Sequence, residues 1–118
     1  MTVKECYEKI GGDYNGVVNR LMTDERITRF AGMFLDDDSY RKLVDAMGEG
    51  DYDLAFRMAH TMKGVTQNLS FEALYQPVNE ITEALRDTHR DVALAESLLP
   101  AVTKQYEITV AGIRELIG

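Results

Sequence analysis

The 118-residue chain has one cysteine, two prolines and no tryptophan. A single cysteine, Cys6, excludes an internal disulfide, and its place in an apolar helical pattern indicates core packing in a reducing, cytoplasmic setting. No apolar run approaches the roughly 20 residues that cross a bilayer, and the acidic N-terminus does not resemble a signal peptide. We therefore expect no membrane partner.

Positive charge is scarce as well. The chain carries 13 Lys and Arg against 20 Asp and Glu, which gives a net charge of −7. Non-specific binding to nucleic acid depends on neutralising phosphates with basic side chains, so we expect no nucleic-acid partner. The length is that of one domain with a single hydrophobic core, and we expect residues 1–118 to form it.

Strand patterns are nearly absent, because apolar residues recur every three to four positions. The pattern predicts two short helices within residues 1–22 and an antiparallel four-helix bundle over residues 24–117, an all-α fold. Pro77 should kink one bundle helix, and Pro100 should either kink the last helix or begin a new segment. The first long helix should start at Asp24. Polar residues suited to cap the other helices are Thr2, Asp13, Asp51, Ser70 and Asp91.

Three aspartates, Asp36 to Asp38, interrupt the first long helix. The apolar stripes before and after them are out of phase, which predicts a kink or break with Asp38 or Ser39 capping the second segment. A divalent-metal site is the alternative. Three adjacent carboxylates do not all face one point, and oxygen-ligand sites need more ligands spread in space, so we expect no metal here.

His60 lies on the polar face of the helix predicted for residues 51–69. At about 100° per residue, the large apolar side chains gather on one stripe and His60 falls nearly opposite to it. Arg57, Gly64 and Gln67 share the polar face, and Lys63 lies at its flank. An ordinary surface histidine is the simplest alternative. The side chains expected to be buried on this stripe are Leu54, Met58, Met62, Val65 and Leu69.

Gly64, one turn after His60, distinguishes this histidine from an ordinary surface residue. A glycine inside a helix costs about 1 kcal/mol relative to alanine, and neither capping nor packing explains it here. Its effect is to remove bulk where a second protein could approach the imidazole. Lys63, a flexible point charge near the ring, is suited to binding phosphate oxygens. No Gly-rich nucleotide-binding loop or magnesium-binding carboxylate set is evident, so we expect no ATP binding.

The run from His60 to Gly64, preceded by Ala59, resembles the signature of histidine-containing phosphotransfer (HPt) domains. The similarity covers most of the chain. It includes Gly12-Asp13, Phe34-Leu35, Gly50-Asp51, Asn68-Leu69 and the segment 71–86. In that family the histidine carries a phosphoryl group between aspartates of response-regulator receiver domains, or receives it from a histidine kinase. The resemblance implies a four-helix bundle with the histidine exposed midway along one helix.

Carried over by position, the resemblance makes His60 the phosphoacceptor, Lys63 the phosphate-stabilising cation and Gly64 the glycine that admits the partner. Many members place a glutamine against the imidazole, but a gapless count puts Thr82 there, with Asn79 one turn earlier. The other candidates for orienting the ring or binding the partner are Arg57, Gln67 and Arg86.

The function expected from this resemblance is that of a monomeric phosphorelay intermediary without a kinase domain or cofactor of its own. Mg²⁺ is expected on the partner receiver domain. An HPt-like adaptor that binds a receiver or kinase without transfer is one alternative. An enzyme that uses His60 as a base or phosphatase nucleophile is another. We interpret His89 as a surface residue.

Overall fold

The computed structural model describes all 118 residues, which form α-helices and one short 3₁₀ turn without any strand, so the all-α prediction is confirmed. No helix is both long and apolar enough to span a membrane. The elements are α1 (Val3–Ile10), α2 (Tyr14–Leu21), α3 (Asp24–Phe34), α4 (Ser39–Glu49), α5 (Tyr52–Asn68), α6 (Glu72–Leu85), η1 (Asp87–His89) and α7 (Val92–Ile117).

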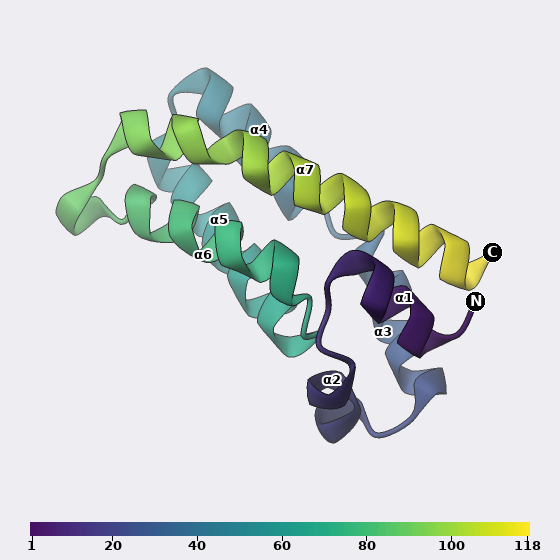
Figure 1. Ribbon diagram of the computed structural model, residues 1–118. Helices are drawn as coiled ribbons and strands as arrows, with labels where there is room; N and C mark the ends of the chain where they lie inside the picture. The colour runs from purple at the N-terminus through teal and green to yellow at the C-terminus, as the bar shows by residue number, and fades with distance from the viewer.

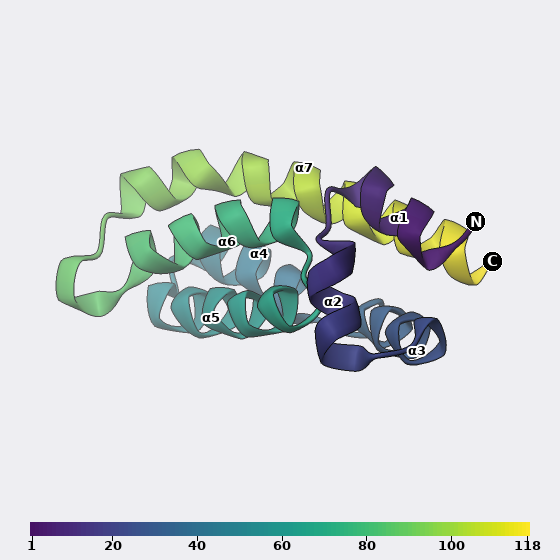
Figure 2. The same cartoon turned by 60° about the horizontal axis from the view of Figure 1, so that its bottom comes forward.

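The helices form an elongated bundle in which sequence neighbours lie side by side. α5 packs between α4 and α6, and α6 packs in turn against α7 (Figure 1). α1 lies along the C-terminal half of α7, and the two chain ends are close together in both views (Figure 2). α2 and α3 pack on each other at this same end of the molecule.

The break at the acidic cluster is confirmed. α3 ends at Phe34 and α4 begins at Ser39, so the two are separate helices. The expected cap is different, however, because the carboxylate of Asp37 accepts the Ser39 N–H at 2.9 Å while Asp38 makes no side-chain capping bond. Asp38 instead pairs with Arg41 and Lys42, at 3.5 and 3.3 Å. Of these two helices, α4 packs along α5, whereas α3 packs mainly with α1, α2 and α7.

Most predicted caps are present. Thr2 and Glu5 form a reciprocal capping box at α1, and the carboxylates of Asp13, Asp51 and Asp91 accept backbone N–H groups at the starts of α2, α5 and α7. These interactions span only three residues, so the local sequence is sufficient to specify them.

The predicted cap at Ser70 is wrong. Ser70 adopts the left-handed conformation with φ of 55°, and α6 begins only at Glu72 after Phe71. The carbonyl oxygen of Ser70 accepts the N–H of Asp13 at 2.8 Å, and its hydroxyl accepts a hydrogen bond from Arg20 at 2.8 Å. Tertiary contacts therefore use the groups that a capping serine would have offered to its own helix.

Both prolines lie inside helices. α6 contains Pro77, and α7 continues without interruption through Pro100, so the alternative that Pro100 begins a new segment is wrong. α6 stops at Leu85, and η1 follows it.

A single cluster of buried apolar residues runs from Val3 in α1 to Ile113 in α7. Cys6 is buried in it, as predicted, with its thiol 3.5 Å from the carbonyl oxygen of Gly112. A Cβ added at Gly112 would collide with Ile10, so this glycine permits the close approach of α1 to α7. The N-terminal helices thus share the core of the bundle.

Candidate functional site

The buried face of α5 differs from the predicted stripe. Its members follow a spacing of four and three residues, and they are Ala55, Ala59, Met62, Thr66 and, just beyond the helix, Leu69. Met58 and Val65, which we expected to be buried, are only partly buried, as is Leu54. At 100° per residue, the true face is rotated by about 60° from the predicted one.

Two side-chain properties explain this rotation. Ala55 and Ala59 are fully buried, because neighbouring helices pack closely against them. Alanine is small and common on both buried and exposed faces, so the sequence does not indicate this burial. Thr66 is also fully buried, and its hydroxyl donates to the carbonyl oxygen of Met62 at 2.8 Å. An apolar pattern alone misses residues of both kinds.

His60 remains exposed under the corrected phase. It is the central residue of the 17-residue α5, and its imidazole lies beside the ring of Phe56 with the centroids 5.8 Å apart. Gly64, one turn later, points almost directly away from the core. A Cβ added there would meet no neighbouring atom within 4 Å, so packing within the chain does not require this glycine. The surface beside the imidazole is therefore open.

Lys63 is partly buried between α5 and α6 and faces an acid that the sequence analysis did not single out. Its ammonium nitrogen is 3.9 Å from a carboxylate oxygen of Glu83. Arg86 donates to both oxygens of the same carboxylate, at 2.9 and 3.1 Å. Hydrogen bonds from Arg86, followed by the charges of Arg86, Lys63 and His89, lower the pKa of Glu83.

Arg86 also approaches the histidine through an aromatic ring. Its guanidinium carbon lies 5.1 Å from the centroid of Phe56, within the range of a cation–π contact. Phe56 thus contacts both His60 and Arg86. The Glu83–Arg86 spacing on one helix was the only sequence signal for this arrangement, since nothing local relates α6 to Phe56 or Lys63.

The two α6 candidates for orienting the imidazole, Thr82 and Asn79, lie away from an open surface at His60. Thr82 is fully buried, and its hydroxyl donates to the carbonyl oxygen of Val78 at 2.7 Å, so it takes no part in a surface around His60. Asn79 is partly buried at the edge of a groove of about 550 Å³ between α6 and α7. Arg57 and Gln67 are exposed on α5.

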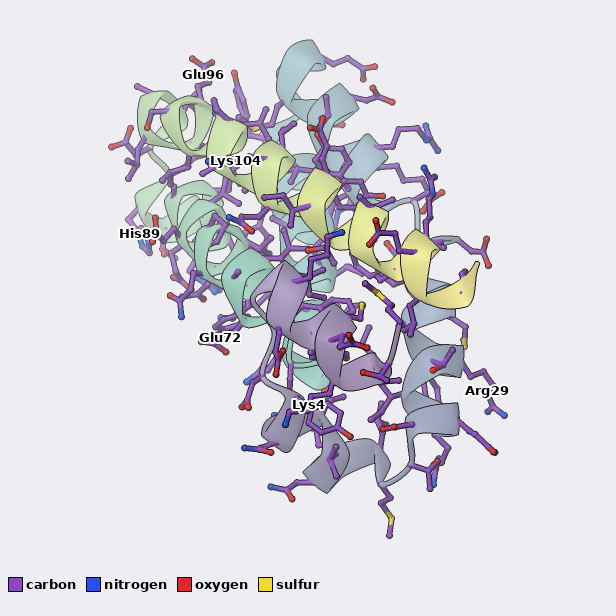
Figure 3. The ribbon with its side chains drawn as sticks, turned by 45° about the vertical axis from the view of Figure 1, so that its right-hand side comes forward. Lys4, Arg29, Glu72, His89, Glu96 and Lys104 are labelled. Carbon is purple, nitrogen blue, oxygen red and sulfur yellow. The ribbon has the colours of Figure 1, made fainter.

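His89 is an exposed residue of η1, as predicted. Figure 3 shows it at the edge of the molecule, at the connection between α6 and α7. Its Nδ1 lies 3.1 Å from the hydroxyl of the neighbouring Thr88. No lysine or glycine accompanies it in the arrangement found around His60.

An apolar groove of about 560 Å³ lies between α2, α3 and the end of α5. Asn68 lines this groove. His60, Gly64 and Asn68 follow each other at intervals of four residues, so they lie on the same face of α5. The groove thus begins about two helical turns from the histidine. Its other lining residues are Arg20, Leu21, Phe30, Met33, Phe34, Asp37, Val65 and Leu69.

These features describe a helical bundle with one histidine at its surface and a lysine and an open glycine beside it. The family model for the Hpt domain matches residues 32–113, well over half of the chain, and the chain belongs to this family. Hpt domains are phosphotransfer carriers of two-component signalling and are not kinases. Comparisons with curated proteins and with solved structures found no significant match. The family match includes α4 to α6 and most of α7, and it leaves α1, α2 and most of α3 outside.

Proposed function

We propose that this protein is a phosphorelay intermediary that accepts and donates a phosphoryl group on His60. The exposed His60 midway along α5, flanked by Lys63 and the open surface of Gly64, is the observation that carries the proposal. In this proposal α4 to α7 are the antiparallel four-helix bundle of the family. The partners are a receiver domain, a histidine kinase or both, and the chain acts as a monomer.

The transfer from a receiver begins with a neutral imidazole nitrogen of His60 attacking the phosphorus of an aspartyl phosphate. The new N–P bond forms while the P–O bond to the aspartyl carboxylate breaks, and the carboxylate leaves with the bonding electrons. The imidazole then releases its remaining N–H proton to solvent. Donation to a second receiver reverses these steps.

Phosphoryl transfer needs in-line placement and charge neutralisation more than covalent assistance from the protein. Lys63 supplies a cation from this chain, since it lies three residues after His60 on the same helix. Mg²⁺ is expected on the receiver, and this chain holds no cofactor of its own. Gly64 removes bulk from the side on which the receiver approaches.

The docking surface is the α5 face that carries His60 and Gly64. One turn further, this face reaches Asn68 and the apolar groove between α2, α3 and α5. An apolar area next to an open polar face suits a protein partner, because interfaces combine a desolvated centre with a polar rim.

The test is a transfer assay with purified receiver domains carrying radioactive phosphate. An acid-labile, base-stable phosphate should appear on the wild-type chain. It should be absent from His60→Gln and retained in His89→Gln, with circular dichroism unchanged in both. Binding without transfer would support the adaptor function instead, and turnover of a small substrate would support an enzyme. Loss of phosphate in His89→Gln but not in His60→Gln would reject the site.

A further inference from the structure

Glu83 contacts two cations near the proposed phosphoacceptor: Lys63, three residues after His60 on α5, and Arg86, which lies over the Phe56 ring beside His60. Arg86 binds its carboxylate through two hydrogen bonds, and Lys63 approaches one oxygen to 3.9 Å. Lys63 comes from the His60 helix, whereas Glu83 comes from α6 and Arg86 directly follows that helix. The acid therefore links the cations across the α5–α6 interface beside Phe56.

The two contacts differ in strength. The Arg86 pair is bidentate and short, and the planar guanidinium is further held over the ring of Phe56. The Lys63 contact is long and single, and lysine is a flexible point charge with three donors. Lys63 can therefore exchange its partner readily, while Arg86 keeps Glu83 in place.

A phosphoryl group on His60 would bring a charge close to −2 to this cluster. It would attract Lys63 and Arg86, and it would repel the carboxylate of Glu83. Glu83 is ionised at neutral pH, because the Arg86 hydrogen bonds and the neighbouring positive charges lower its pKa. The carboxylate and the phosphoryl group thus compete for the same cations.

We infer that Glu83 is a positioning residue that holds Lys63 while His60 is unmodified and that weakens the binding of the phosphoryl group on His60. The inference rests on the proposed function and adds that Glu83 favours transfer of the phosphoryl group away from His60. A carrier must release what it accepts, and a competing acid makes phosphoryl-His60 less stable, which favours onward transfer.

The experiment measures the equilibrium of phosphoryl exchange between His60 and a purified receiver domain. In Glu83→Gln, the equilibrium should shift toward phosphoryl-His60 by about two- to fivefold, the range that an exposed ion pair allows. Glu80→Gln removes the same charge from an exposed position of α6 that forms no ion pair, and it should shift the equilibrium far less. Glu83→Asp should return the value toward wild type.

The direction of the effect separates positioning from a structural role. If Glu83 only maintained the fold, its loss would reduce phosphoryl occupancy, and such a reduction would overturn the inference. Equal shifts in Glu83→Gln and Glu80→Gln would overturn it as well, because they would reflect general charge alone. In a Lys63→Met background the effect of Glu83→Gln should shrink, and an undiminished effect would reject the role of Lys63 as the exchanged cation.

A second phosphoryl donor, phosphoramidate, allows failure of this inference to be told apart from failure of the proposed function. Phosphoramidate can phosphorylate imidazole directly: its P–N bond breaks, a new P–N bond forms, and ammonia leaves with the imidazole proton. The product is read by ³¹P NMR. If the wild-type chain gains no phosphate on His60 from either donor, both the function and the inference fail. If wild type is phosphorylated and Glu83→Gln behaves as wild type with both donors, only the inference fails.

Discussion

The hydroxyl of Tyr7 donates a 2.7 Å hydrogen bond to the carbonyl oxygen of Leu69. Both residues are buried, so the bond joins α1 to the end of the His60 helix inside the core. Two further N-terminal residues reach the same turn, since the Asp13 N–H and the Arg20 side chain both bind Ser70. The turn between α5 and α6 is thus held by helices that lie outside the family match.

Tyr7→Phe should lower the free energy of unfolding by about 1 to 3 kcal/mol, because the buried carbonyl of Leu69 loses its donor. Urea denaturation followed by circular dichroism would measure this change. Tyr14→Phe is the matched control, because the Tyr14 hydroxyl binds Asp24 at the surface. We expect that variant to stay within about 0.5 kcal/mol of wild type. Equal losses in the two variants would show that the Tyr7 bond is not energetically special.

Met62→Ala should cost about 2 to 5 kcal/mol, because the side chain is almost completely buried and its removal leaves a cavity. Met58→Ala is the comparison on the same helix and should cost clearly less, since Met58 is only partly buried. Thermal and urea unfolding of both variants would measure the difference. A cost below about 0.5 kcal/mol for Met62→Ala would mean that the core face of α5 is assigned incorrectly.

Gly64→Ala should stabilise the isolated domain by up to about 1 kcal/mol through its better helix propensity. Gly64→Gln or Gly64→Trp should slow transfer between His60 and a receiver without unfolding the chain, because a large side chain would obstruct the partner. Gly48→Gln is the control, since Gly48 is also helical and faces open space on α4. Wild-type transfer rates in Gly64→Trp would remove the argument for partner access.

Lys63→Ala should slow phosphoryl exchange substantially without abolishing it, because the receiver's metal also neutralises the transferring group. Lys63→Arg should keep part of the activity, since the charge survives with a different geometry. Rapid-quench measurement of the exchange rate would detect both effects. Lys104→Ala, an exposed lysine on α7, is the control. A normal rate in Lys63→Ala would reduce Lys63 to a solvated surface charge.

The sequence predicted the features that depend on neighbouring residues. The caps at Thr2, Asp13, Asp51 and Asp91, and the break near Asp37, all involve groups within a few positions of each other. The exposure of His60 was also predictable, because it tolerates a rotation of about 60° in the helix phase. The sequence therefore predicts features that depend on nearby residues or that do not change with a moderate error in the helix phase.

The sequence did not predict features that depend on tertiary contacts. Ser70 lost its expected capping role to distant Asp13 and Arg20, and the burial of Ala55 became visible only when the neighbouring helices were in place. Glu83 could not be connected with Lys63, because no spacing along the chain encodes the register of α5 against α6. These residues share one property: their surroundings come from other helices.

The anchoring of the α5–α6 turn by the N-terminal helices has a practical consequence for work with isolated segments. A fragment trimmed to the limits of the family match would begin at Gly32 and would lack the donors at Tyr7, Asp13 and Arg20. Its turn would carry exposed carbonyl groups and a strained serine without compensation. Chimaeras that graft this module onto other signalling proteins should therefore carry its first three helices, because hydrogen bonds from α1 and α2 hold the turn that joins α5 to α6.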